Sequence, residues 1–136
     1  MKRYLQFTSI SLLLLTAINA TVAGVLFILD PSGHKMGMSV SYIKDSPFNS
    51  YLIPGIVLLI VNGLMNFIAA YFVFKKKPSA SLLVIIQGIL LSGWIVIQVI
   101  MVKDISPLHI IMFTLGAILT MSGFLQLKLI RKDVSR

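Results

Sequence analysis

The sequence has 136 residues, of which 57% are hydrophobic and 12% are charged, and its formal net charge is +8. A soluble domain carries about 25% charged residues, and one of this length has too little interior to hide so much apolar surface. The composition therefore excludes a water-soluble protein. The chain has no cysteine, which excludes disulfides, thiolate metal sites and cysteine nucleophiles. Its length predicts one membrane domain over residues 1–136.

Four long apolar segments follow one another along the chain, at residues 5–29, 51–74, 79–102 and 107–127. A helix needs roughly 20 residues to cross about 30 Å of hydrocarbon, and each segment is that long. Because lipid offers the backbone no hydrogen-bond partner, each segment must be helical. The fold class predicted is all-α, a bundle of four transmembrane helices in up-down order.

Serine–proline pairs mark two helix starts. In Ser46-Pro47 and Ser106-Pro107, the serine suits an N-cap and the proline suits the first turn. We therefore expect helices over residues 5–29, 47–74, 79–102 and 107–127. Pro54 falls one to two turns into the second helix, where it predicts a kink or a change of tilt.

The first segment has a second interpretation. Met1-Lys2-Arg3 before an apolar run also begins a cleavable signal peptide, and Thr21-Val22-Ala23 is an acceptable cleavage site. The apolar run continues to residue 29, longer than a usual signal core, which favours a retained helix.

Basic residues are concentrated on one side of the predicted bundle, which holds nine of the twelve. They are Lys2, Arg3, Lys75, Lys76, Lys77, Lys128, Arg131, Lys132 and Arg136. On the other side, Lys35, Lys44 and Lys103 are balanced by Asp30, Asp45 and Asp104. The positive-inside rule then predicts a multi-pass protein of the inner (plasma) membrane with both termini in the cytoplasm. The cationic tail is expected to pair with anionic lipid headgroups, and nucleic acid is not an expected partner.

Polar side chains inside the segments need partners away from water. We predict a buried polar layer of Asn19, Asn62, Asn66 and Gln87. Either these amides hold helices together, or they line a cavity for a small polar ligand. Small residues that recur every four positions, such as Gly88 with Ser92 and Gly116 with Thr120, favour close packing within the protein over a dimer interface.

The outer end of the bundle is the second candidate region. The connection over residues 30–50 is too apolar for a solvated loop, so we expect it either to lie on the outer membrane surface or to cap the bundle. Trp94 lies too deep for an interfacial aromatic belt and shares a helix face with Gln98. The candidate ligand-binding residues are Phe48, Tyr51, Trp94, Gln98 and His109.

No metal or cofactor is expected, since the two histidines and the aspartates show no recognised ligand spacing. The spans carry no carboxylate or lysine of the kind that proton-coupled transport uses, and no nucleophile and base pair can be assigned. We therefore predict a non-enzymatic bundle that binds lipid, a membrane protein partner or a second copy of itself. The alternative is a small transporter or channel for an uncharged solute.

Several short motifs carry a resemblance. They are Asp30-Pro31-Ser32-Gly33, Gly37-Met38, Ser46-Pro47-Phe48, Tyr51, Pro54-Gly55, Asn62-Gly63 and Trp94-x-x-x-Gln98. Together they resemble an uncharacterised family of small four-span bacterial membrane proteins. The resemblance implies the four-helix fold, contributes no activity, and suggests that Trp94, Gln98 and the loop form one outer feature. Lys103-Asp104 departs from the less charged turn expected there.

Overall fold

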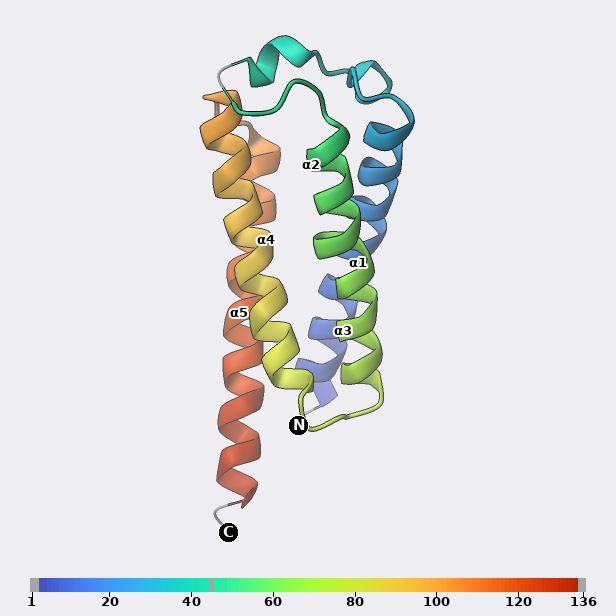
Figure 1. The fold of residues 1–136 in the computed structure, drawn as a ribbon. Coiled ribbons are helices and arrows are strands. Elements are labelled where there is room, and N and C mark those ends of the chain that lie inside the picture. Colours follow the sequence, from blue (N-terminus) through green and yellow to red (C-terminus); the bar gives the residue numbers. More distant parts are fainter. Residues whose placement is uncertain (1–2, 45, 135–136) are drawn as a thin grey trace.

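The computed structural model describes residues 3–44 and 46–134. Lys2, Asp45 and Arg136, which enter the charge pattern above, lie outside the described residues. Four helical spans run antiparallel in chain order, and within the two described stretches there is no strand. The chain begins and ends on the same side of the bundle (Figure 1). The predicted all-α four-helix bundle is confirmed.

Three of the spans are single α-helices: α1 (Arg3–Leu29), α4 (Ala80–Val102) and α5 (Pro107–Val134). The second span is continuous from residue 52 to residue 74 but has three parts. These are α2 (Leu52–Val57), a π-helix η3 (Leu58–Leu64) and α3 (Met65–Phe74).

The connection between the first two spans contains two short 3-10 helices, η1 (His34–Met36) and η2 (Val40–Ile43). We call the side of the bundle that carries this connection the loop end, and the opposite side, where both chain ends lie, the terminal end (Figure 1).

Two predicted helix ends were wrong. The second span begins at Leu52, not at Pro47, because the Ser46 hydroxyl donates to the carbonyl of Ile43 at 2.7 Å and accepts from the Phe48 amide at 3.2 Å. That serine closes a turn of the loop and caps no helix. The last helix continues to Val134, seven residues past the predicted end, and projects beyond the other spans at the terminal end (Figure 1).

The second span is irregular, but not at Pro54, where a kink or a change of tilt was predicted. Pro54 is the third residue of α2, in the first turn, where a missing N–H breaks no helical hydrogen bond. The irregular stretch is the π-helix that begins one turn later, in which the amide of Met65 donates to the carbonyl of Ile60. A π-helix of seven residues is long for this rare conformation, and the sequence analysis did not predict it.

Glycines bring the spans together in two close pairs. In the first pair, a Cβ placed on Gly24 of α1 would lie 2.9 Å from the Gly55 carbonyl oxygen of the second span. In the second, a Cβ on Gly88 of α4 would lie 2.6 Å from the Thr120 nitrogen and 2.8 Å from the Gly116 carbonyl oxygen of α5. Helices approach this closely only where side chains are absent or small. The small-residue spacing therefore marks packing inside the protein, as expected.

The two pairs meet each other mainly at the terminal end. There α1 contacts α5, and α3, rather than α2, contacts α4. Leu13, Ala69, Val84 and Leu119 form the centre of the shared core. At the loop end the pairs are joined instead through the connection, because η2 packs against α4.

The outward surface of the bundle is apolar along its length. Ile18, Ile68, Ile89 and Met121, one from each span, are 54%, 52%, 54% and 65% exposed. Monomeric soluble proteins do not expose apolar patches on this scale, and all four spans are long and apolar enough to cross a bilayer. The chain is a multi-pass membrane protein.

The close approach of α4 and α5 predicts different effects of the same substitution at two glycines. Gly88→Val places a branched side chain against α5 and should destabilise the protein by about 1–3 kcal/mol. Gly93→Val is the matched control, because Gly93 lies on the same helix and a Cβ there meets nothing within 4 Å. Unfolding in mixed detergent micelles measures the difference, and equal loss at both positions would contradict the packing described.

Candidate functional site

Tyr51 fastens the loop to the bundle through three contacts. Its backbone amide donates to the Pro31 carbonyl at 2.9 Å, and its hydroxyl donates to the Ser39 carbonyl at 2.7 Å. Its ring stacks on Phe27 of α1, with centroids 4.8 Å apart. The side chain is 4% exposed, and burial raises the pKa of the Tyr51 phenol. The hydroxyl therefore remains a donor at neutral pH.

Position 33 must be a glycine because the Tyr51 ring leaves no room for a side chain there. A Cβ on Gly33 would lie 2.8 Å from Cε2 of Tyr51, and its φ of +85° is one that residues with side chains rarely adopt. The turn that carries Gly33 is closed by Asp30. One carboxylate oxygen of Asp30 accepts from the Ser32 hydroxyl at 2.5 Å, and the other accepts from the Lys35 amide at 3.1 Å. The hydrogen bond from Ser32 is the main reason that the pKa of Asp30 lies below its usual value.

Ile43 forms the underside of the loop. It is 1% exposed and belongs to a core cluster with Phe27 and Tyr51. Phe48 and Trp94 pack against the same cluster. The loop is therefore a packed cap over the end of the bundle, which is one of the two arrangements expected from the sequence, and its side chains pack against both helix pairs.

A small cavity of about 50 Å³ lies beneath this cap. Most of its lining is apolar, but four side chains with hydrogen-bonding groups line it: Tyr51, Trp94, Gln98 and His109. The Tyr51 hydroxyl is already bonded to the Ser39 carbonyl. A cavity needs roughly 10–15 Å³ to hold one water molecule, so this one accommodates a small polar group. The indole Nε1 of Trp94 is buried and has no hydrogen-bond partner within the protein.

The hydrogen bonds of His109 assign its tautomer. Its Nδ1 accepts from the Ser106 amide at 3.1 Å, so in the neutral ring the proton is on Nε2. His109 is the third residue of α5 and holds the turn at the start of this helix, since its own amide donates to the Ser106 carbonyl at 3.0 Å. The free side of the imidazole is therefore a donor, like the Trp94 indole.

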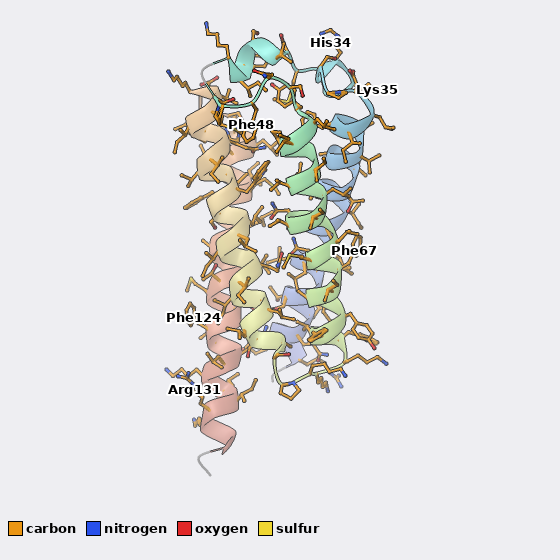
Figure 2. All side chains as sticks on the ribbon, viewed as in Figure 1. His34, Lys35, Phe48, Phe67, Phe124 and Arg131 are labelled. Carbon is orange, nitrogen blue, oxygen red and sulfur yellow. The ribbon has the colours of Figure 1, made fainter. Side chains whose placement is uncertain are left out.

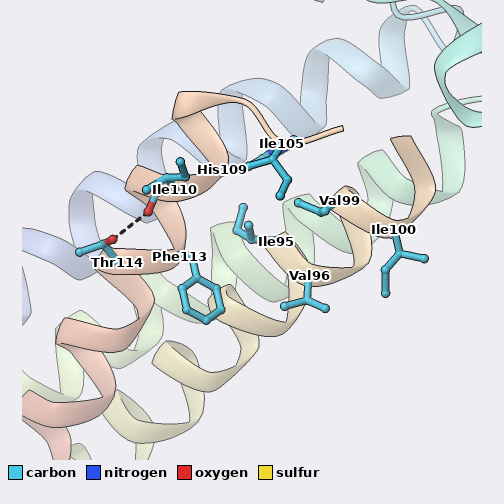
Figure 3. Close-up of a pocket in the computed structure, with 9 residues that line it drawn as sticks. All are labelled: Ile95, Val96, Val99, Ile100, Ile105, His109, Ile110, Phe113 and Thr114. Carbon is cyan, nitrogen blue, oxygen red and sulfur yellow. Dashed lines mark hydrogen bonds between the residues drawn. The ribbon is translucent and has the colours of Figure 1, made fainter. Parts of the chain in front are cut away.

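His109 also lines a second, larger cavity of about 280 Å³. This groove runs between α4 and α5 near the loop end, and Figure 3 shows its lining side chains on the two helices and, for Ile105, on the turn that joins them. Apart from His109, its one polar side chain is Thr114, whose hydroxyl donates to the Ile110 carbonyl at 2.8 Å. Ile100 and Ile110 are 66% and 61% exposed, so the groove opens sideways on the apolar surface.

Four of the five residues predicted for the outer site come together. Tyr51, Trp94, Gln98 and His109 all line the small cavity. Phe48 packs on the cluster around it but lines neither of the two cavities. Figure 2 shows Phe48 at the loop end, beside the end of α4.

The predicted polar layer is correct for three residues and wrong for one. Asn62 and Asn66 are 0% exposed and Gln87 is 1% exposed, but Asn19 lies on the exposed face of α1. The face of α1 that turns inward carries Thr16, Ala17 and Ala20, and Asn19 points away from it. Thr16, which is 1% exposed, takes its place in the core.

A third polar group, at the terminal end, was not predicted. Ser9 of α1 and Ser122 of α5 are hydrogen-bonded through their hydroxyls at 2.7 Å, and the Gln126 amide donates to Ser9 at 2.5 Å. All three are buried. They join the two helix pairs across the bundle. Gln126 lies one residue before the end assigned to the last helix, and serines in an apolar span carry little signal of their own.

Among the described residues, no three histidine or acidic side chains gather as a metal site requires. Searches against family models, curated proteins and solved structures found no match to this chain. The chemistry available at the loop end is therefore hydrogen-bond donation from Trp94 and His109 beside an apolar groove.

The Tyr51 hydroxyl predicts a stability change confined to the loop. Tyr51→Phe keeps the stacking on Phe27 and removes the bond to Ser39, which should weaken loop closure by about 0.5–1.5 kcal/mol. Amide hydrogen exchange at Met38 and Tyr51 should become faster. Tyr42→Phe is the control, since Tyr42 is 51% exposed, and an equal effect there would contradict the anchoring role.

Asp30 predicts an acid-sensitive loop. Its pKa in the folded protein lies below the ordinary 3.8, so its contribution is fully present above that value and is lost as the pH falls through the folded pKa. Protection of the Ser32 and Lys35 amides should therefore decrease only below about pH 4. Asp30→Asn should remove this dependence and Asp104→Asn should retain it. A transition near neutral pH would show that another group controls the turn.

Proposed function

We propose that this protein is a non-enzymatic, lipid-binding membrane protein that receives one phospholipid at the loop end. The observation that carries the proposal is the position of His109, which lines both the small polar cavity and the apolar groove. A lipid molecule has these two parts, a polar region and a chain, joined over a short distance. Ligand sites of this type are mostly apolar with a few fixed polar groups.

The polar part of the site favours an acceptor. Trp94 Nε1 has no partner, and the Nε2 of His109 carries the proton because Nδ1 is occupied by Ser106. The phosphate and ester oxygens of a phospholipid are acceptors only. A cavity lined by two donors therefore matches the region of a lipid where headgroup and chains join.

The apolar part of the site, the groove between α4 and α5, favours the acyl chain of a lipid. Its volume of about 280 Å³ lies between two spans and is open to the surrounding hydrocarbon. A ligand that reaches it must arrive through the bilayer, because the loop covers the adjoining cavity from above. Lipid is the ligand that is present there at high concentration.

The orientation that we propose places the loop end outside the cytoplasm, in the inner membrane of a bacterium. Its support is the charge distribution: Arg3, Lys75, Lys76 and Lys77, together with the basic residues of the α5 extension, all belong to the terminal end. Figure 2 shows Arg131 near that end and Lys35 at the other. Anionic headgroups would be the partners of these cations. The family resemblance noted above agrees with this assignment and remains a prediction.

The experiments below also distinguish two alternatives to lipid binding. A membrane protein partner or a second copy of this chain would cover the groove with side chains instead of a lipid chain. A small transporter or channel for an uncharged solute is the second candidate function. It is favoured by Asn62 and Gln87, whose amide groups are buried and without partners in the protein. Neither of the two cavities is lined by them.

Lipid binding predicts that the two donors act together. In the double variant Trp94→Phe, His109→Phe, both rings stay aromatic while both donors are lost, and affinity for phospholipid should fall about tenfold. Native mass spectrometry after detergent titration measures the lipid retained. Asn19→Leu is the control, because it removes an exposed amide from the lipid-facing side of α1.

The groove is tested by filling it. Val96→Trp should exclude the acyl chain of the lipid from the groove and lower lipid retention. It should leave the contacts of Tyr51 with the loop in place. If lipid retention is the same in the wild-type protein, the double variant and Val96→Trp, the site does not bind lipid. If cross-linking from position 96 instead joins two copies of the chain, the groove is a protein interface.

A further inference from the structure

The interior of the bundle contains a group of amides with unused hydrogen-bonding atoms, well away from the loop end. Asn62, Asn66 and Gln87 are at most 1% exposed. Both polar side-chain atoms of Asn62 and of Gln87, and the side-chain oxygen of Asn66, have no partner within the protein. The Thr16 hydroxyl, also 1% exposed, is unpartnered as well.

Contacts between the spans place Thr16 and Asn66 at nearly the same level of the bundle, with Asn62 about one helical turn nearer the loop end. A Cβ on Gly63 would lie 2.7 Å from the Thr21 hydroxyl oxygen, so Gly63 and Thr21 are opposite each other in the antiparallel pair. Asn66 lies three residues from Gly63 and Thr16 lies five from Thr21, both toward the terminal end. With a rise of about 1.5 Å per residue, the two differ in depth by only about 3 Å.

Gln87 reaches the same level from the other helix pair. The tight turn between α3 and α4 is closed by hydrogen bonds from Lys77 to Phe72 and from Ala80 to Lys77. Asn66 lies eight residues before the last residue of α3, and Gln87 lies seven residues after the first residue of α4. The two amides are therefore at matching depths in antiparallel neighbours, and both face the core.

The π-helix of the second span contains Asn62 and ends two residues before Asn66. Where its hydrogen-bond pattern ends, the Asn66 side-chain nitrogen donates to the Asn62 backbone carbonyl at 2.6 Å. This bond uses one of the two amide donors of Asn66 and none of the polar side-chain atoms of Asn62. π-Helical turns occur often at functional sites because they redirect side chains and carbonyls.

The chemistry of the group selects a neutral ligand that both donates and accepts. Each free amide presents a donor and an acceptor, whichever way it is turned. A cation would bring a charge to a level where the described spans carry no acidic side chain to balance it. Water supplies both kinds of hydrogen bond, and internal waters typically make two to four bonds to groups of this kind.

We propose that Asn62, Asn66 and Gln87, with Thr16, form an internal water-binding site that begins at Asn62 in the π-helix and extends about one helical turn toward the terminal end. The site is separate from the loop-end cavity, which none of these residues lines, and it does not depend on lipid binding there. It joins the two helix pairs through bridging water where direct side-chain bonds between them are not made.

The test is solid-state NMR of the protein in lipid bilayers, with asparagine and glutamine side chains labelled with ¹⁵N. Magnetisation started on water should reach the amides of Asn62 and Gln87. Asn19 is the matched control, since it lies in the first span but on its exposed face, and its amide should receive magnetisation from lipid chains instead. Transfer to Asn62 and Gln87 from lipid or protein alone would overturn the proposal.

Two variants test whether the amides share the same water. Asn62→Leu should abolish water transfer to Gln87, and Gln87→Met should abolish transfer to Asn62, so either variant suffices if the other does not fold. Gln98→Leu alters the loop-end cavity and should leave both signals unchanged. Persistence of the Gln87 signal in Asn62→Leu, or of the Asn62 signal in Gln87→Met, would show that the amides do not form one site.

Discussion

Close approach of helix backbones at glycines is the constraint on which the rest of this structure depends. In lipid there is no hydrophobic force between helices, so association relies on packing and on hydrogen bonds. Gly24 with Gly55, and Gly88 with Gly116, bring α1 to the second span and α4 to α5. The bundle consequently consists of two tightly packed helix pairs, and the two pairs must be joined to each other by contacts other than these glycines. Polar side chains supply such contacts at the terminal end, where Ser9, Ser122 and Gln126 connect α1 to α5.

At the loop end the space between the pairs is filled by the loop itself. Ile43 enters from above and Tyr51 fixes the loop to α1 through Phe27. A small cavity remains beneath the loop, and Trp94 and Gln98 of α4 and His109 of α5 line it. The candidate lipid site is thus a consequence of how the pairs diverge. This also explains why His109 belongs to both the inner cavity and the outer groove.

The sequence was sufficient for features that depend on hydropathy and spacing, and insufficient for those that depend on rotation and register. The number of spans was predicted correctly. The cap is one of the two arrangements expected for the loop, and Tyr51, Trp94, Gln98 and His109, which were grouped by their depth, line one cavity. Asn19 was assigned to the wrong face because α1 is apolar all round, and periodicity then gives no direction. The π-helix has no sequence signature strong enough to predict it. Ser46 was taken for an N-cap because its bond to Ile43 depends on the folded loop.

The loop connects a titratable turn to the proposed lipid site through a short series of contacts. Asp30 closes the turn that presents Pro31, whose carbonyl accepts from the Tyr51 amide. Tyr51 in turn shares a core cluster with Ile43, which covers the cavity. Opening the Asp30 turn therefore acts on the cover of the cavity and not on its donors, which α4 and α5 hold independently. Loss of the turn should expose the polar part of the site to water while leaving the groove between α4 and α5 intact. Water would then compete with the lipid for the donors of Trp94 and His109, while the groove continues to hold the acyl chain.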